Sequence, residues 1–169
     1  MLADPDIAEI SFVIISKHLW FVKRKFAFFR YFLGNCWQRW FVLGILRKII
    51  LFLFGGSAYV GLELLWRGRS HGSMFLAGGL CFLLLGALHR ASPRLPWLLR
   101  GMAGAGIITT VELLMGLLFN RDYHVWDYRR LPFHFHGQIC LPFFFLWVPV
   151  SLGAMVLYGM AERIVKKLV

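Results

Sequence analysis

Long apolar segments separated by short polar connections dominate the chain. Four of them are long enough to cross a bilayer as helices, at residues 49–66, 73–89, 97–119 and 139–161. None shows the alternation of apolar and polar residues that is typical of strands in a membrane barrel. Backbone groups in lipid must be hydrogen-bonded within the protein, so these segments are predicted to be helices. The pattern therefore predicts an all-α, polytopic helical membrane protein with four core transmembrane helices.

A basic and aromatic segment, residues 1–48, precedes this core of residues 49–169. Residues 7–22 are apolar, but as a helix they would rise only about 24 Å, less than the roughly 30 Å of the hydrocarbon core. Residues 26–46 carry polar and aromatic side chains on different sides of a helix, which is typical of a helix in the membrane interface. Two interfacial helices and a short transmembrane hairpin both remain open, and we favour the interfacial placement.

Composition and charge strengthen the membrane interpretation. Apolar residues make up 59% of the chain and charged residues 16%, against about a quarter charged in soluble domains. A net charge of +11 would suggest nucleic acid in a soluble protein. Here most basic residues flank apolar segments, where they contact anionic headgroups. We therefore expect membrane lipids and no nucleic acid as partners. The three cysteines have neither metal nor disulfide spacing, and no cofactor or metal is predicted.

Lysine and arginine are distributed unequally between the two sides of the predicted membrane core. Of the 19 in the chain, eight lie before the first span, three in the second connection, three in the C-terminal tail, and five on the opposite side. Because cytoplasmic loops carry the excess of basic residues, both termini are predicted to be cytoplasmic. The connection of residues 120–138 then faces outward from the plasma membrane.

Two stretches that lie 49 residues apart resemble each other. The first contains Glu63 and is followed by a His-Gly pair at His71; the second contains Glu112 and is followed by a His-Gly pair at His136. Each unit contains two spans, so equivalent helices point the same way. The core is thus predicted to be two parallel two-helix repeats related by an axis along the membrane normal. The second unit carries sixteen extra residues before its His-Gly pair.

Glu63 and Glu112 are the strongest candidates for function. An acidic side chain within a transmembrane segment is costly, and it usually faces the bundle interior or a watery cavity. Such a residue can be a gate, a proton-coupling group or a ligand contact, or it can form a structural ion pair. Arg67 follows Glu63 at the spacing that favours a helical ion pair. Glu112 has no such neighbour and is therefore the better functional candidate.

The long outward connection gathers most of the other polar side chains. Arginines beside Asp127 are suited to an anionic headgroup because guanidinium binds phosphate in a bidentate manner, although an aromatic belt with extended arginines explains them equally. Histidines near the acids could bind a metal, but no paired metal motif is present, and helix capping or headgroup contact is favoured. The candidate polar cluster consists of Glu63, Arg67, His71, Glu112, Asp127, Arg129, Arg130, His134, His136 and Gln138.

Four short runs in and after this connection carry a family resemblance. They are Trp126-Asp127-Tyr128, Leu131-Pro132-Phe133, Gly137-Gln138-Ile139-Cys140-Leu141 and Phe145-Leu146-Trp147. Together they resemble the pattern that precedes the final span of the CmpB-like ABC-transporter type IV membrane proteins. The resemblance covers residues 55–150 and is specific mainly at 126–147. Arg129 stands where that pattern has serine, Pro149 falls where a glycine-rich stretch is common, and residues 1–50 show no recognised counterpart.

The resemblance implies a protein of the bacterial inner membrane with a role in transport. The chain has no Walker motif, so transport would require a separate ATPase, another energy source or passive movement. We therefore favour a small permease-like protein, or a membrane subunit of a transport complex, whose outward polar cluster contacts substrate or a lipid headgroup. It would assemble with itself or with other membrane subunits.

Two other functions remain open at this stage. One is a structural or scaffold subunit of a larger membrane complex. The other is an intramembrane, lipid-acting enzyme that uses Glu112, His136 and Asp127. The acids and histidines lack a recognised catalytic spacing, which argues against the enzyme.

Protease treatment of right-side-out vesicles tests the predicted orientation. We expect cleavage within residues 120–138 from the outside and protection of tags at both termini, because both termini are predicted to be cytoplasmic. A protected loop together with cleaved terminal tags would reverse the topology.

Overall fold

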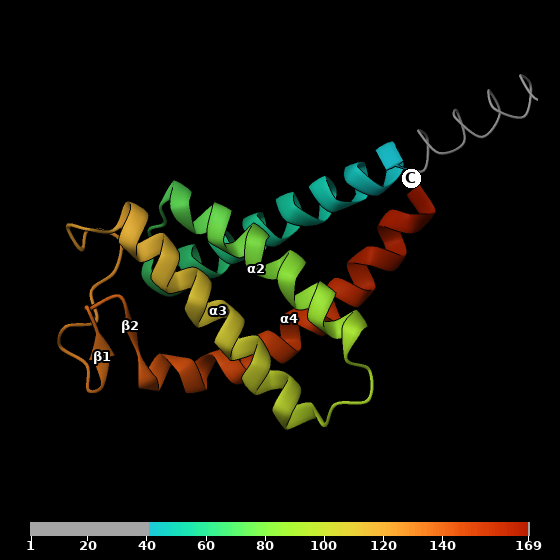
Figure 1. Ribbon diagram of the computed structural model, residues 1–169. Helices are drawn as coiled ribbons and strands as arrows, with labels where there is room; N and C mark the ends of the chain where they lie inside the picture. Colours follow the sequence, from blue (N-terminus) through green and yellow to red (C-terminus); the bar gives the residue numbers. More distant parts are fainter. Residues whose placement is uncertain (1–40, 169) are drawn as a thin grey trace, which may run out of the picture. The chain divides into compact units, whose positions relative to one another are not determined.

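The computed structural model describes residues 41–168. Over these residues the chain forms four long helices, Phe41–Arg67, α2 (Gly72–Ala91), α3 (Trp97–Phe119) and α4 (Leu141–Leu168), shown in Figure 1. Each is long and apolar enough to cross a membrane. The prediction of an all-α, polytopic membrane protein is therefore confirmed.

The predicted N-terminal helices lie almost entirely outside the described residues, so their placement stays a prediction. The first described helix nevertheless includes residues 41–48, which the sequence analysis assigned to the N-terminal segment. Arg47-Lys48, which directly precedes the predicted first span, therefore lies within this helix. Basic residues favour the edge of the membrane, and they are compatible with a continuing helix whose side chains extend to water.

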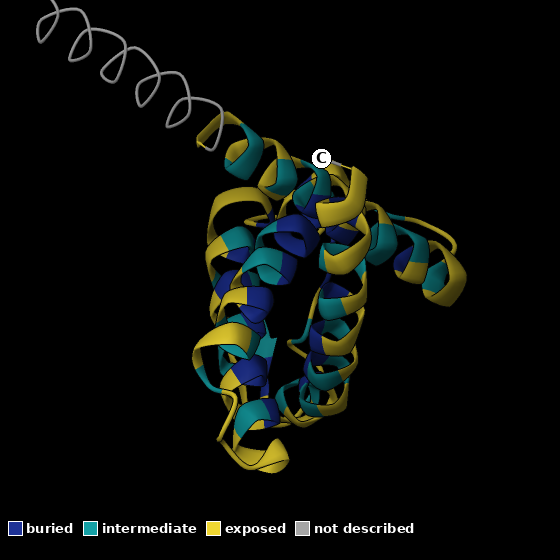
Figure 2. Cartoon of the chain, turned by 90° about the vertical axis from the view of Figure 1, so that its right-hand side faces the viewer, coloured by how far each residue is buried: buried dark blue, intermediate teal, exposed yellow. Residues whose placement is uncertain are grey.

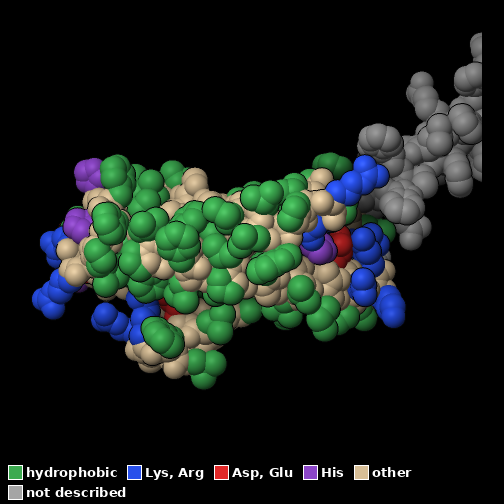
Figure 3. Space-filling view, turned by 90° about the horizontal axis from the view of Figure 1, so that it is seen from below, with side chains coloured by type: hydrophobic (Ala, Val, Ile, Leu, Met, Phe, Trp, Pro, Cys, Tyr) green, Lys and Arg blue, Asp and Glu red, His purple; other side chains and the backbone are tan. Residues whose placement is uncertain are grey.

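The outside of the bundle is largely apolar. Leu65 and Trp66 are 87% and 89% exposed, and many other leucines and phenylalanines are exposed along the helices. Figure 2 shows the buried residues facing the interior of the bundle, and Figure 3 shows hydrophobic side chains over its middle with Lys, Arg and His at its two ends. Hydrocarbon tails are the solvent that suits such a surface, with charges kept at the headgroups. The protein is a multi-pass membrane protein.

Small residues let α3 and α4 approach closely. A Cβ atom on Gly104 would lie 2.6 Å from the Ser151 Oγ atom, and Ser151 is fully buried. The Ser151 hydroxyl donates a hydrogen bond to the Gly101 carbonyl at 3.0 Å. Close contact and hydrogen bonding across helices replace the hydrophobic effect, which is weak between helices in lipid.

The fourth helix bends and separates from the first helix along its length. Leu51 of the first helix packs with Tyr158 and Val165 near the end of α4. From there α4 diverges from the first helix toward its own N-terminal end (Figure 1). Pro149 lies within α4, where it removes a backbone donor and favours a bend. Pro149 thus lies in the part of α4 that runs apart from the first helix.

A short hairpin precedes α4. Strands β1 (His134–Phe135) and β2 (Ile139–Cys140) pair antiparallel, with His134 opposite Cys140 and Phe135 opposite Ile139. The turn between them has positive φ angles at His136 and Gly137.

The two His-Gly pairs therefore occupy different local structures. His71 is the N-cap of α2 and accepts a hydrogen bond from the Ser73 backbone. At His136-Gly137 the left-handed turn leads the chain into β2, and α4 begins only after it, at Leu141. The internal repeat itself stays a prediction.

Replacing Gly104 by alanine is expected to destabilise the bundle, and Gly106→Ala in the same helix provides the matched control. A Cβ atom on Gly106 would meet nothing within 4 Å. Overpacking costs about 1–3 kcal/mol, so the apparent Tm in detergent should fall for Gly104→Ala relative to Gly106→Ala. Equal melting temperatures for the two variants would contradict the close packing of α3 on α4.

Candidate functional site

The loop between α3 and α4 is held over the end of the bundle by a buried polar network. Asn120 and Gln138 are 1% and 3% exposed. The Asn120 side-chain amide donates to the Trp126 carbonyl at 2.6 Å and to Gln138 Oε1 at 3.1 Å. In return, Gln138 Nε2 donates to the Asn120 carbonyl at 2.9 Å, and Trp126 Nε1 donates to the Gln138 carbonyl at 2.8 Å. These reciprocal bonds fix the loop, because each buried polar group has its partner there.

Glu63 forms a structural ion pair at this end of the first helix. Its carboxylate is bonded by Arg67, and Ser70 Oγ donates to its second oxygen at 2.6 Å. Arg67 also donates to the Val125 carbonyl in the loop at 2.8 Å. Glu63 and Arg67 therefore tie the first helix to the loop, and both oxygens of the acid are already bonded.

Glu112 lies in α3 in a different environment. Tyr128 donates its hydroxyl to Glu112 Oε1 at 2.7 Å, and Trp147 Nε1 donates to Oε2 at 3.1 Å. Burial and the nearby Glu112 carboxylate raise the pKa of Tyr128, so this hydroxyl keeps its proton and can donate. No Lys, Arg or His among residues 41–168 is bonded to Glu112. The two donors come from the loop and from α4, and Glu112 thereby joins three parts of the fold.

A cavity of about 340 Å³ borders Glu112. All four helices contribute to its wall, and Trp126 of the loop lines it as well. Most of the side chains that form the wall are apolar, and Glu112 contributes a carboxylate to it. The lining residues used below are Ala58, Tyr59, Leu62, Trp126, Val150, Trp147, Gly153 and Leu157.

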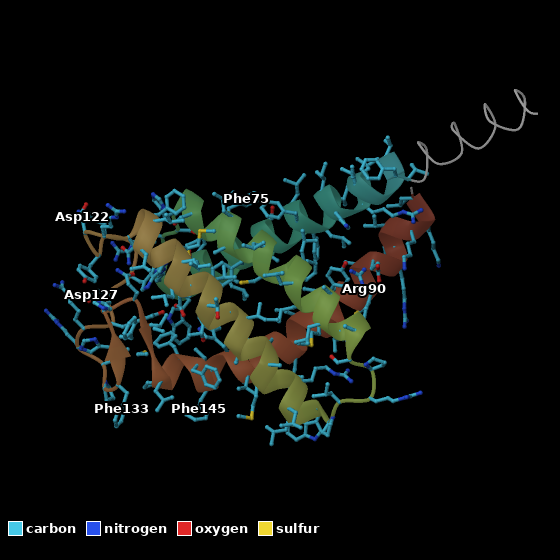
Figure 4. All side chains as sticks on the ribbon, viewed as in Figure 1. Phe75, Arg90, Asp122, Asp127, Phe133 and Phe145 are labelled. Carbon is cyan, nitrogen blue, oxygen red and sulfur yellow. The ribbon has the colours of Figure 1, made fainter. Side chains whose placement is uncertain are left out.

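The remaining candidate residues lie at the surface of the loop. Asp127 and Arg129 form an exposed bidentate pair, with Nε–Oδ1 and Nη2–Oδ2 distances of 2.9 and 2.8 Å, and Asp127 lies away from the helices in Figure 4. Hydrogen bonds from Arg129 lower the pKa of Asp127 to about 2. A depressed pKa means that the pair is intact at neutral pH and is lost only as the pH falls toward that value. Arg130 is exposed beside it.

The histidines of the hairpin are also exposed. His134 Nδ1 accepts a hydrogen bond from the Gly137 backbone at 3.3 Å, and His136 contacts the Phe135 ring edge to face. Within residues 41–168, no three His, Cys, Asp or Glu side chains are grouped closely enough to hold a metal ion.

Comparison with protein families gives one match. The model of a family described as "Putative ABC-transporter type IV" matches residues 7–169. The chain belongs to this family. The match includes most of the N-terminal region for which the sequence analysis found no counterpart. Neither the comparison with curated proteins nor the comparison with solved structures found a match.

Three of the four runs that carry the family resemblance contribute to the cavity or to the contacts around it. Trp126 lines the cavity, Tyr128 and Trp147 bind Glu112, and Gln138 holds the loop in place. The structure thus separates the predicted polar cluster into an interior part at Glu112, an ion pair at Glu63, and a surface part on the loop and hairpin. Glu63, Glu112 and His136 share no hydrogen bond in the described part of the chain.

Sequence reasoning missed the two donors of Glu112. Tyr128 and Trp147 lie 16 and 35 residues from Glu112 along the chain, so no local spacing connects them. The available signal was that both residues belong to the runs that carry the resemblance.

Removing the Gln138 side chain is expected to loosen the loop. Gln138→Ala removes two buried hydrogen bonds between the Gln138 side chain and Asn120, at a cost of about 1–3 kcal/mol. Backbone hydrogen exchange over residues 120–140 should become faster and the apparent Tm should fall. Asp127→Ala, which removes only exposed hydrogen bonds from Arg129, is the control and should leave the apparent Tm and the exchange of the loop amides other than that of Arg129 nearly unchanged. Unaltered exchange in Gln138→Ala would show that the network does not hold the loop.

Proposed function

We propose that this protein is a small permease-like membrane component, or the membrane subunit of a transport complex, and that its substrate contacts Glu112 in the cavity. The observation that carries the proposal is a carboxylate within a membrane span that borders a cavity and has no basic partner among the described residues. Ionisable residues within spans mark substrate or ion pathways. The family, which is described by its relation to transport, is consistent with this role.

The comparison with Glu63 sharpens the argument. Both acids lie within transmembrane helices, and burying a charge without a partner is costly. At Glu63 the chain supplies Arg67, four residues away, and a serine hydroxyl. At Glu112 it supplies only neutral donors and leaves a cavity beside the carboxylate. A purely structural role would be served better by an ion pair, so the scaffold alternative explains Glu63 but not Glu112.

The surface part of the polar cluster fits contact with headgroups or with substrate at the membrane surface. Asp127, Arg129, Arg130, His134 and His136 are all exposed at the loop end of the bundle. Phe133 of the loop and Phe145 of α4 are 80% and 60% exposed and lie on the same side in Figure 4. Aromatic side chains next to arginines are typical of the membrane interface. We infer that the loop faces outward from the inner membrane, with both termini in the cytoplasm.

Partners follow from what the chain lacks. It contains no nucleotide-binding motif, so active transport would use a separate ATPase subunit or another energy source. A bundle of four described helices is small for a transporter, and we infer that the protein assembles with itself or with another membrane subunit. The two parallel repeats belong to the same proposal, with Glu63 and Glu112 at equivalent positions and different bonding.

Reconstitution tests this function. The protein, with any subunit that co-purifies in mild detergent, is placed in liposomes loaded with a pool of small solutes, with and without ATP. Mass spectrometry should find at least one solute that redistributes only when the protein is present. Glu112→Gln removes the charge and should slow this movement about tenfold or more, since bonds to a charged group contribute about 1.5–3 kcal/mol.

Asp122→Asn is the matched control for the same exchange of acid for amide, because Asp122 is exposed on the loop. It should transport at the wild-type rate. Absence of any redistribution, or a wild-type rate in a folded Glu112→Gln protein, would contradict the proposed function.

A further inference from the structure

The cavity beside Glu112 opens sideways between the first helix and α4. Leu62 and Leu157 line it and are 58% and 39% exposed, so they form its rim. Gly153 of α4 also lines it, and a Cβ atom there would meet nothing within 4 Å. The two helices are in contact at the other end, around Leu51. The opening therefore lies among apolar, exposed positions of the helices, where lipid tails surround the protein.

The carboxylate at the inner wall still has capacity to accept hydrogen bonds. An ionised carboxylate has about four acceptor sites. Tyr128 and Trp147 each occupy one of them, on different oxygens. The other sites, on a group that borders the cavity, can be met by a ligand that donates hydrogen bonds. A positive charge on that ligand would also balance the charge of Glu112.

The aromatic wall favours the same kind of ligand. Trp126, Trp147 and Tyr59 all line the cavity with Glu112. The faces of tryptophan and tyrosine attract an ammonium group, most strongly where water is excluded. Apolar side chains such as Ala58 and Val150 line other parts of the wall and suit a hydrocarbon tail. The cavity thus combines an anionic and aromatic site for a cation with an apolar site for a chain.

We propose that the cavity binds a protonated lipophilic amine that enters from the bilayer between the first helix and α4. This proposal rests on the proposed function, because it names the substrate class of the same site. A volume of about 340 Å³ is near the lower limit of typical ligand pockets, which favours a single-chain amine over a two-chain lipid. A fatty acid would place a second negative charge beside Glu112, and a lipid tail alone would make no use of the carboxylate.

Photolabelling in lipid nanodiscs tests this binding. The probe is dodecylamine with a diazirine in its chain, added to the protein in phosphatidylcholine nanodiscs, and labelled residues are located by mass spectrometry. We expect labels on residues 58–62 of the first helix and 150–157 of α4. Unlabelled dodecylamine should compete at least about tenfold better than dodecanol or dodecanoic acid, a difference of about 1.4 kcal/mol. Glu112→Gln should remove this preference, and Asp122→Asn should keep it.

A second variant tests the route of entry without touching the carboxylate. Gly153→Leu places a side chain at the opening, where space is free, so the protein should keep its apparent Tm and lose most of the labelling. Labels confined to the outer faces of the helices, or equal competition by amine, alcohol and acid, would overturn the proposal.

The two proposals fail in different ways. Transport that depends on Glu112 but acts on solutes other than amines, with no amine labelling, would refute the lipophilic amine and leave the proposed function standing. Amine labelling at the cavity without movement of any solute would refute transport and support the binding site.

Discussion

Water is absent from the interior of a bilayer, so every polar group placed there needs a partner within the protein or a ligand. This constraint shapes the described fold more than any other. It makes the spans helical, since a helix satisfies its own backbone. It also leads to different solutions for the two acids within spans. Glu63 is bonded by Arg67 and Ser70, and Glu112 by Tyr128 and Trp147.

The loop between α3 and α4 has its shape because it meets part of this need. Tyr128 must reach α3 from the loop, and Arg67 must reach the Val125 carbonyl from the first helix. Both contacts require the loop to lie across the end of the bundle. The buried pair of Asn120 and Gln138 holds it there with its own hydrogen bonds. The loop of 21 residues thereby keeps its polar hydrogen-bonding groups inside and leaves its charged side chains on the surface.

The cavity depends on the loop that lies across the end of the bundle and on the course of α4. The first helix and α4 pack around Leu51 and Val165 and diverge toward the loop. Gly104 and Ser151 keep α3 close to α4 over this region. The space that remains lies among all four helices and next to Glu112. Its wall combines a carboxylate and aromatic rings with apolar side chains.

The sequence alone was sufficient to predict the helical spans. The length and composition of an apolar segment are local properties, and they determine whether the segment can cross the bilayer. The sequence also indicated the pairing of Glu63 with Arg67, since four residues make one helical turn. It could not show that Tyr128 and Trp147 bind Glu112, that His136-Gly137 forms a hairpin turn, or that a cavity exists. These features depend on contacts between residues far apart in the chain and on how closely helices approach. Only the tertiary structure decided them, because packing sets those distances.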